Sequence, residues 1–274
     1  MPKNQETVAA ATPVDRRQRV QSAETGLAIL KALTRLGGSA SLTAIAQNVG
    51  ESTAKVHRYL SSFAQEGFVA QEPVTLHYYL STESIRLGQA ALRQCDPVRL
   101  SEPALRRLRT ELELTCFVAV MGNLGPTVLR IEEPSLPVTV NIRPGSVLSL
   151  LWSATGQAFL AYAQDSETQR KAAAEFALGT PEQQQMLGGR IEGLATWSKQ
   201  VREQGVAAVQ DLLLRGISAV SSPIFSAEGQ VIAVLTVLGA TQSFDLAVDA
   251  PVVQEVRKEA QSISTAMGYS AGTS

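Results

Sequence analysis

The sequence contains few of the residues that build metal and catalytic sites. Its 274 residues include two cysteines and two histidines. Cys95 and Cys116 lie far along the chain from His57 and His77, so no zinc-ligand spacing is present. A GxxxxGKS or GxxxxGKT phosphate loop and a GxGxxG segment after a strand are also missing. We therefore expect no bound metal, no cofactor and no catalytic residues.

Long apolar runs are missing as well. The longest, residues 231–238, already contains Thr236, whereas a membrane helix needs about 20 apolar residues. The first twenty residues lack the apolar stretch and the small-residue cleavage site of a signal peptide. With 45% hydrophobic and 18% charged residues, the composition is that of a folded globular protein. The length favours two domains, and we expect a cytoplasmic protein without disulfides.

Charge is distributed unevenly along the chain. Residues 1–93 hold ten Lys or Arg and seven Asp or Glu, whereas residues 94–274 hold 14 and 18. Arg16, Arg17 and Arg19 cluster just before the first predicted helix. A basic arm that leads into a small helical domain is typical of nucleic-acid binding, although charge alone is equally consistent with a solvated surface.

Residues 21–80 carry apolar residues at helical spacing, interrupted by short glycine turns. The pattern predicts one helix over residues 23–36, a second that begins after a cap at Ser41, and a third that begins after a cap at Ser52 or Thr53. Two short β-prone runs, residues 68–71 and 76–80, then flank a proline turn. Helices joined by a glycine turn and followed by a hairpin are typical of a winged helix-turn-helix.

The third predicted helix carries a row of hydrogen-bond donors away from its apolar stripe. These residues, which suit base edges or phosphates, are Thr53, Lys55, His57, Arg58 and Ser62. A merely solvated face is the alternative, but such a face would also contain acidic residues, and Glu51 and Glu66 lie only at its ends. We predict that Ser52, Thr53, Lys55, His57 and Arg58 bind DNA, together with Arg16, Arg17 and Arg19.

The segment AETGLAILKALTRLGGSASLTAIAQNVGESTAKVHRYLSSFAQEGFV resembles the N-terminal winged helix-turn-helix of the IclR family of bacterial transcription regulators. Val56-His57-Arg58 and Gly67-Phe68-Val69 match the family pattern directly. Ala54-Lys55 stands where the family usually has Ser-Thr, and Ser81 stands where a glycine normally follows the wing. We expect these departures to affect which operator sequence is recognised and to leave the fold intact.

The resemblance extends over residues 98–267, where RPGSVLSLLWSATGQAFLAY and EQGVAAVQDLLLRGISAVSSPIFSAEGQVIAVLTVLGA are similar to the family's effector domain. Strand-like runs are predicted at residues 115–121, 127–132, 138–142, 206–209, 217–224 and 231–238. Helical segments are predicted at residues 153–202 and 252–267. We expect one antiparallel sheet with helices to one side, which agrees with the GAF-like domain that the resemblance implies.

The fold class is therefore α+β, with four successive parts. These are a basic arm (residues 1–20), a winged helix-turn-helix (21–80), a linker helix (81–96) and an effector-binding domain (97–270).

A small-molecule pocket is expected in the second domain. Ser153, Ala154, Thr155 and Gly156 start a helix there and offer hydroxyls and backbone N–H groups to a carboxylate, although a simple N-cap is the alternative. The resemblance implies pocket positions at Val140, Leu148, Ala154, Thr155, Val209, Ala219, Thr236 and Leu238. The family commonly has Asp at the position of Val209 and His at that of Leu151, whereas both are apolar here. Asn141 and Arg143 are candidates to supply polarity or charge.

These residues predict a one-component transcription regulator. Two or four subunits would bind a pseudo-palindromic operator, and an aromatic or similarly apolar monocarboxylic acid, as met in aromatic acid catabolism, would alter that binding. The alternative is an enzyme whose active site is the C-terminal pocket, with the winged helix used only for assembly. We expect a non-enzyme. Turnover of a ligand by residues 94–274 would instead favour the alternative.

Overall fold

The structure, a computed structural model, describes residues 20–134, 141–163 and 165–270. The chain divides into two compact units, Met1–Ala91 (the N-terminal unit) and Leu92–Ser274 (the C-terminal unit). Each unit folds around buried apolar residues of its own. Among the described residues, no helix is both long and apolar enough to cross a membrane.

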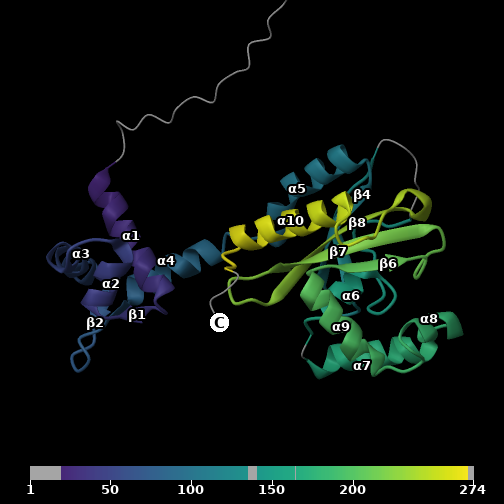
Figure 1. Ribbon diagram of the computed structural model, residues 1–274, viewed down its shortest axis with the longest axis horizontal. Helices are drawn as coiled ribbons and strands as arrows, with labels where there is room; N and C mark the ends of the chain where they lie inside the picture. The colour runs from purple at the N-terminus through teal and green to yellow at the C-terminus, as the bar shows by residue number, and fades with distance from the viewer. Residues whose placement is uncertain (1–19, 135–140, 164, 271–274) are drawn as a thin grey trace, which may run out of the picture. The chain divides into compact units, whose positions relative to one another are not determined.

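The N-terminal unit combines helices with a small antiparallel sheet (Figure 1). Its elements are α1 (Gln21–Arg35), β1 (Ser39–Ala40), α2 (Leu42–Val49), α3 (Thr53–Gln65), β2 (Val69–Gln71) and β3 (Tyr78–Leu80). The strands pair in the order β1-β3-β2. Helices α2 and α3 with the β2–β3 hairpin form the predicted winged helix-turn-helix. Helix α4 (Thr82–Leu92) follows and contains the boundary between the two units.

Local capping explains where the helices of this unit begin and end. The Ser41 hydroxyl accepts the Ala44 N–H at 3.3 Å at the start of α2, and the Ser52 hydroxyl accepts the Lys55 N–H at 3.3 Å at the start of α3. Of the two expected caps of α3, the structure therefore uses Ser52. The apolar stripes of the three helices meet in the core, where the 0% exposed residues include Ile29, Leu33, Ile45, Val56 and Leu60. Their burial fixes which face of α3 remains outside.

The C-terminal unit is built on one antiparallel sheet of five strands. The strands are β4 (Thr115–Met121), β5 (Pro126–Glu132), β6 (Ala207–Gln210), β7 (Ile217–Phe225) and β8 (Val231–Ala240), in the order β5-β4-β8-β7-β6. These agree closely with the strands predicted from alternating apolar residues. The further strand expected at residues 138–142 falls mostly outside the described residues, and Asn141 and Ile142 are not in a strand.

Helices cover both faces of this sheet, so the expectation of helices to one side is wrong (Figure 1). Helices α5 (Pro97–Leu112) and α10 (Pro251–Ala266) pack on one face, and α6 (Ala154–Leu160) packs on the other. The reason lies in β8, where residues 233–238 are all buried. Successive side chains of a strand point to opposite faces. A strand without exposed positions therefore needs cover on both.

The remaining helices of the C-terminal unit lie on the α6 side of the sheet (Figure 1). They are α7 (Ser166–Leu178), α8 (Pro181–Met186) and α9 (Gly193–Gln204), and a short 3-10 helix, η2 (Thr241–Ser243), follows β8. On the opposite face of the sheet, α5 and α10 are joined by a bidentate ion pair: Arg107 donates to both carboxylate oxygens of Glu259 at 2.8 and 2.6 Å. The hydrogen bond to Glu259 raises the pKa of Arg107. The two helices are thereby fixed to each other over the sheet.

Candidate functional site

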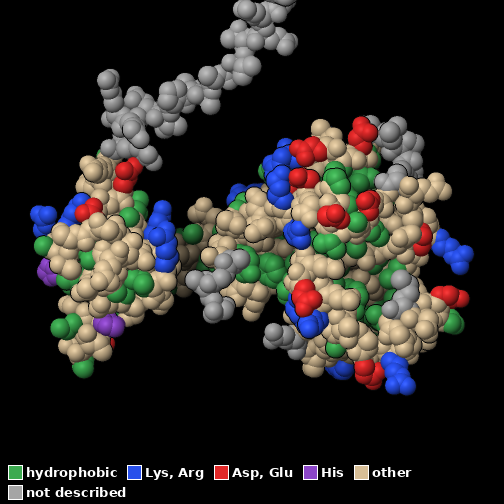
Figure 2. Space-filling view, viewed as in Figure 1, with side chains coloured by type: hydrophobic (Ala, Val, Ile, Leu, Met, Phe, Trp, Pro, Cys, Tyr) green, Lys and Arg blue, Asp and Glu red, His purple; other side chains and the backbone are tan. Residues whose placement is uncertain are grey.

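The first candidate site is the outer face of α3. Ser52, Thr53, His57 and Arg58 are all exposed, and Lys55 is half-buried. The chain's histidines lie on the surface of the N-terminal unit, as the purple side chains in Figure 2 show. The buried Val56 and Leu60 hold the opposite face of the helix in the core. The sequence-predicted donors therefore lie together on a surface that is free to meet a large partner.

The two cations of this face differ in their surroundings. Lys55 forms an ion pair with Glu51, with 2.6 Å between Nζ and Oε1, one turn earlier in the chain. Within the described residues, the Arg58 guanidinium has no ion pair and no hydrogen bond. Arg58 is thus available to a phosphate or a guanine edge, whereas Lys55 must first leave Glu51. The sequence places Glu51 four residues before Lys55, a spacing that favours this pairing.

The wing is exposed but carries no Lys or Arg. Val74 is 87% exposed and Leu76 is 61% exposed, and His77 is also exposed. Leu76 has a φ of +58°, an uncommon conformation for a residue other than glycine. The cations of this unit therefore lie outside the wing, and Arg16, Arg17 and Arg19 lie outside the described residues.

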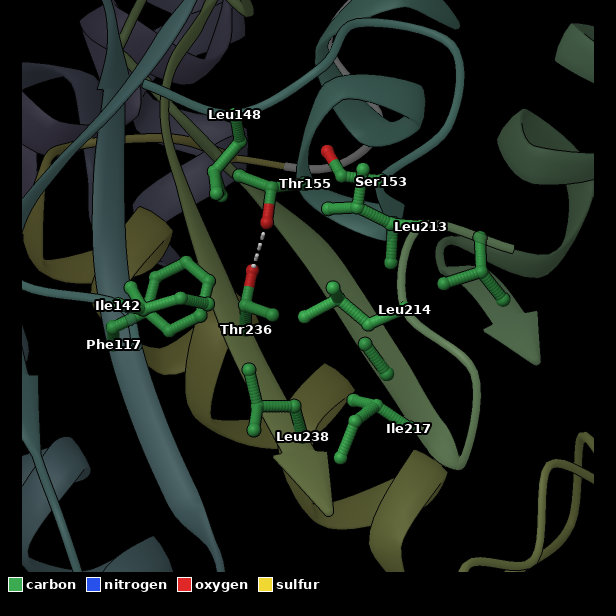
Figure 3. Close-up of a pocket in the computed structure, with 13 residues that line it drawn as sticks. Phe117, Ile142, Leu148, Ser153, Thr155, Leu213, Leu214, Ile217, Thr236 and Leu238 are labelled. Carbon is green, nitrogen blue, oxygen red and sulfur yellow. Dashed lines mark hydrogen bonds between the residues drawn. The ribbon is translucent and has the colours of Figure 1, made fainter. Parts of the chain in front are cut away.

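The second candidate site is a cavity in the C-terminal unit between α6, the sheet and residues 211–216 (Figure 3). The space within it, including the part that is open to solvent, is about 410 Å³. The lining residues are Phe117, Ile142, Leu148, Ser153, Ala154, Thr155, Val209, Leu213, Leu214, Ile217, Ala219, Thr236 and Leu238. Eight positions expected from the sequence thus meet at one cavity: Leu148, Ser153, Ala154, Thr155, Val209, Ala219, Thr236 and Leu238. Small-molecule sites are typically concave and mostly apolar in this way.

One expected position is not among the lining residues, and another cannot be compared with the cavity. Val140 lies outside the described residues. Gly156 is not among the lining residues, because it packs against the preceding loop: a Cβ built at Gly156 would lie 2.1 Å from the Ser149 carbonyl oxygen. The glycine therefore permits close packing of the helix start and does not offer a surface to a ligand.

The start of α6 is already occupied by the protein's own groups. The Ser153 hydroxyl accepts the Gly156 N–H at 2.9 Å and donates to the Ser149 carbonyl at 2.5 Å. The Glu175 carboxylate, from α7, accepts the Leu150 and Leu151 N–H groups at 3.0 Å each and the Ser149 hydroxyl at 2.6 Å. Of the two interpretations of Ser153, the N-cap describes its hydroxyl in this structure. Glu175 holds the loop that leads from Leu148 to α6.

Besides Ser153, the polar side chains of the described lining are Thr155 and Thr236. The Thr155 and Thr236 hydroxyl oxygens lie 2.8 Å apart and face each other inside the cavity (Figure 3). No charged side chain is among the described lining residues. Arg143 is exposed and donates to Glu133 at 3.2 Å and to the Ile142 carbonyl at 2.9 Å, and neither Arg143 nor Asn141 lines the cavity.

Some lining residues were not anticipated from the sequence. They are Phe117, Ile142, Leu213, Leu214 and Ile217. Leu213 and Leu214 are 40% and 47% exposed and belong to the loop between β6 and β7. The Asp211 carboxylate closes the base of this loop by accepting the Gly216 N–H at 2.6 Å and the Thr241 hydroxyl at 2.9 Å. The sequence did contain a signal for Leu213 and Leu214, because they are leucines in a loop that ends in glycine.

The titratable groups of the C-terminal unit do not form a reactive centre at the cavity. Cys95 and Cys116 are free thiols, and burial raises the pKa of Cys116 to about 12. Cys116 donates to the Leu105 carbonyl on the α5 side of the sheet and is not among the cavity's lining residues. In the part of the chain that the structure describes, no group of three or more His, Cys, Asp and Glu residues could hold a metal ion.

Comparison with known families gives two matches that together cover most of the chain. The family model described as "Bacterial transcriptional regulator IclR C-terminal" matches residues 89–265, and "IclR helix-turn-helix domain" matches residues 22–73. These ranges contain the cavity and α3, respectively. The two candidate sites therefore lie in two different family domains.

Individual proteins give the same result. The HTH-type transcriptional repressor AllR of Escherichia coli K12 is 28% identical over 257 residues, covering 92% of this chain and 92% of that protein. The HTH-type transcriptional regulator BhcR of Paracoccus denitrificans is 27% identical over 219 residues, covering 76% of this chain and 74% of that protein. The crystal structure of Pseudomonas aeruginosa HmgR is 38% identical with a TM-score of 0.82, covering 92% of this chain and 100% of that chain.

Proposed function

Because the chain belongs to the IclR family of bacterial transcriptional regulators, we propose that it binds a pseudo-palindromic operator through α3 and that an apolar acid in its C-terminal cavity alters this binding. The observation that carries the first half is the outer face of α3, where Arg58 is exposed and makes no ion pair within the described residues. A regulator of this kind acts on the chromosome, so we assign it to the bacterial cytoplasm.

The residues of α3 have different proposed tasks. Arg58 reads a guanine edge or holds a phosphate, and His57 and Thr53 contact neighbouring bases or phosphates. Ser52 lies at the helix N-terminus, where backbone N–H groups face a phosphate. Lys55 exchanges Glu51 for a phosphate when DNA binds. Two or four subunits present paired copies of α3 to the two operator half-sites.

The basic arm adds affinity without reading many bases. Arg16, Arg17 and Arg19 release counterions when they follow the DNA backbone or enter a minor groove. Because the wing lacks Lys and Arg, the arm is the main cationic supplement to α3. Most of the salt dependence of binding is then expected to come from these three arginines and from the cations of α3.

The proposed effector is an aromatic or similarly apolar monocarboxylic acid. Phe117, Ile142, Leu148 and Leu238 offer apolar contacts to its body, and Val209 and Ala219 add no polar group. A ligand rich in hydroxyls would leave several of them without partners in this lining, at about 1–3 kcal/mol each. The cavity therefore favours an apolar acid over sugar acids and short hydroxy acids.

The proposal of a regulator rather than an enzyme is supported by the names of the relatives, which are transcriptional regulators or repressors. The test is fluorescence anisotropy of a labelled operator, selected from the organism's own DNA, at fixed salt. An aromatic acid should change operator affinity and be recovered chemically unchanged. Conversion of the acid by the purified protein, without an effect on DNA binding, would contradict the proposal, and a preference for sugar acids would contradict the effector class.

A further inference from the structure

A second hollow of the C-terminal unit lies beside β7 and α10, which run next to each other (Figure 1). It is bounded by residues 222–225 of β7, residues 257–264 of α10, Gly205 and Tyr269, and we call it the β7–α10 groove. The space within it, including the part that is open to solvent, is about 510 Å³. This size is typical of small-molecule sites. None of its described lining residues also lines the cavity.

The groove exists because β6 is short. Within the described residues, β6 pairs with β7 only from Ala207 onward, so residues 222–225 of β7 have no strand beside them on that side. This free edge is poorly suited to an added strand. Pro223 has no N–H group, and the N–H of Phe225 is accepted by the Ser264 hydroxyl at 3.0 Å. The space beside β7 therefore fits a small molecule better than a peptide strand.

Arg257 supplies a positive charge to the groove. The residue is half-buried, and within the described residues it makes no ion pair. Its guanidinium donates to the Gln204 carbonyl at 3.1 Å and to the Gln254 side-chain oxygen at 2.6 Å. Because Gln204 precedes Gly205, these bonds place the guanidinium at the groove.

The guanidinium still has donors to offer. It carries five N–H groups, of which the two bonds use two, so three have no partner among the described residues. No acidic residue is among the described lining residues of the groove. An anion, and a carboxylate in particular, is therefore the complementary partner of Arg257.

An aromatic pair forms another wall of the groove. The rings of Phe225 and Tyr269 are stacked, with centroids 4.8 Å apart and 24° between their planes. Tyr162 packs with its edge against Phe225, with centroids 5.2 Å apart. Within the described residues, neither the Tyr269 hydroxyl nor the Gln261 amide makes a hydrogen bond, so both can donate to a ligand. This wall suits a planar apolar ring.

We propose that the β7–α10 groove is a second small-molecule site, which binds an aromatic carboxylate with its charge at Arg257 and its ring against Phe225 and Tyr269. A half-buried cation without a described ion pair and an aromatic wall meet there in one hollow. The site goes beyond the proposed function and does not depend on it, because no described residue lines both the groove and the cavity. One chain can then hold two acids.

Fluorine NMR of the full chain, labelled with 3-fluorotyrosine, tests the groove directly. The chain has five tyrosines, and none of them is among the described lining residues of the cavity. Tyr269→Phe identifies the Tyr269 resonance by its loss. In the wild type, benzoate should shift this resonance to saturation. Benzamide has a similar shape but no charge, and it should bind at least about fivefold more weakly because it forms no ion pair with Arg257.

Variants assign the binding to Arg257. Arg257→Gln should weaken benzoate by about tenfold or more and remove its advantage over benzamide. Arg257→Lys keeps the positive charge and should retain this advantage. Lys258→Gln removes the neighbouring cation of α10, which is paired with Glu255, and should change neither ligand. Val209→Asp, which is expected to weaken acid binding in the cavity, should leave the Tyr269 shift in place. Circular dichroism confirms that each variant is folded.

The outcomes separate the groove from the cavity. The inference is wrong if benzoate gives no saturable shift of the Tyr269 resonance, as when a second copy of the chain covers the groove. It is also wrong if benzamide or Arg257→Gln gives the same affinity as benzoate with the wild type. Loss of the shift in Val209→Asp but not in Val209→Ala would show that the cavity causes it, which overturns the groove and keeps the proposed effector. If benzoate binds the groove and no aromatic acid alters operator binding, the groove stands and the proposed function fails.

Discussion

The two units of the protein place their functional residues in opposite ways. The N-terminal unit carries its candidate DNA contacts on the outside of α3, where Arg58 and His57 are exposed. The C-terminal unit carries its candidate ligand contacts inside, where Thr155 and Thr236 are 1% exposed. A site on the surface of one helix can be changed with little effect on folding. A site made of core residues cannot, because the same side chains also hold the unit together.

The largest expected effect comes from introducing a charge into the interior site, which is the cavity of the C-terminal unit. Val209 is 7% exposed and lines the cavity. Val209→Asp places a second negative charge near an acid ligand in an apolar surrounding, which should cost on the order of 3 kcal/mol, about a hundredfold in affinity. Calorimetry with an aromatic acid measures the loss. Val209→Ala is the control and should keep most of the affinity, and equal binding by the Asp variant would show that Val209 is remote from the ligand.

A substitution at the exterior site, the outer face of α3, should weaken operator binding and leave acid binding by the C-terminal unit unchanged. Arg58→Ala should weaken operator binding by about 1–3 kcal/mol if Arg58 contacts a guanine in two places. Operator anisotropy at fixed salt measures this, and calorimetry with the acid should give the wild-type value. Lys199→Ala, an exposed cation of the C-terminal unit, is the matched control. Loss of affinity in the control alone would place the DNA-binding surface elsewhere.

Glu175 tests the claim that the interior site depends on the fold around it. Its carboxylate accepts three hydrogen bonds from the loop before α6, and an amide in its place has a single acceptor oxygen. Glu175→Gln should lower the free energy of unfolding by about 1–3 kcal/mol in a urea titration and should weaken the acid as well. Glu203→Gln, at an exposed ion pair, should change stability by less than about 0.5 kcal/mol. If Glu175→Gln changes neither the free energy of unfolding nor the affinity for the acid, the loop before α6 holds its position by packing alone.

The smallest expected effect concerns the basic arm. Its contribution to operator affinity comes from counterion release, which is largest at low salt and smaller at higher salt. Removal of residues 1–19 deletes Arg16, Arg17 and Arg19 together with Lys3. The slope of log affinity against log salt should then flatten by about 2 to 3 units. A slope identical to that of the full chain would show that the arm makes no contact with DNA.

The exterior site could largely be predicted from the sequence, because one helix and its caps determine it. The spacing of Val56 and Leu60 fixes the buried face of α3, and Ser52 fixes its start, so the outward residues follow. The pairing of Lys55 with Glu51 was the detail that was missed, although its spacing was visible in the sequence.

The interior site was predicted only in part. The resemblance gave seven of the lining positions and the predicted helix start gave Ser153. Glu175 lies 24 to 26 residues from its partners, and local patterns do not encode such contacts. Gly156 was interpreted as a ligand contact, whereas the backbone of Ser149 approaches it too closely for a side chain. The cover on both faces of the sheet was also missed, since the all-buried run at residues 233–238 was not used to place helices.

The central claim is that occupation of the interior site changes the affinity of the exterior one. The most direct test measures operator affinity of the wild type and of Val209→Asp, each with and without a saturating aromatic acid, at one salt concentration. The account predicts that the acid changes wild-type operator affinity by at least about fivefold and leaves that of the variant unchanged. The variant must first be shown by circular dichroism to be folded and by anisotropy to bind the operator without acid. An acid that changes the affinity of both proteins equally, or of neither, would contradict it.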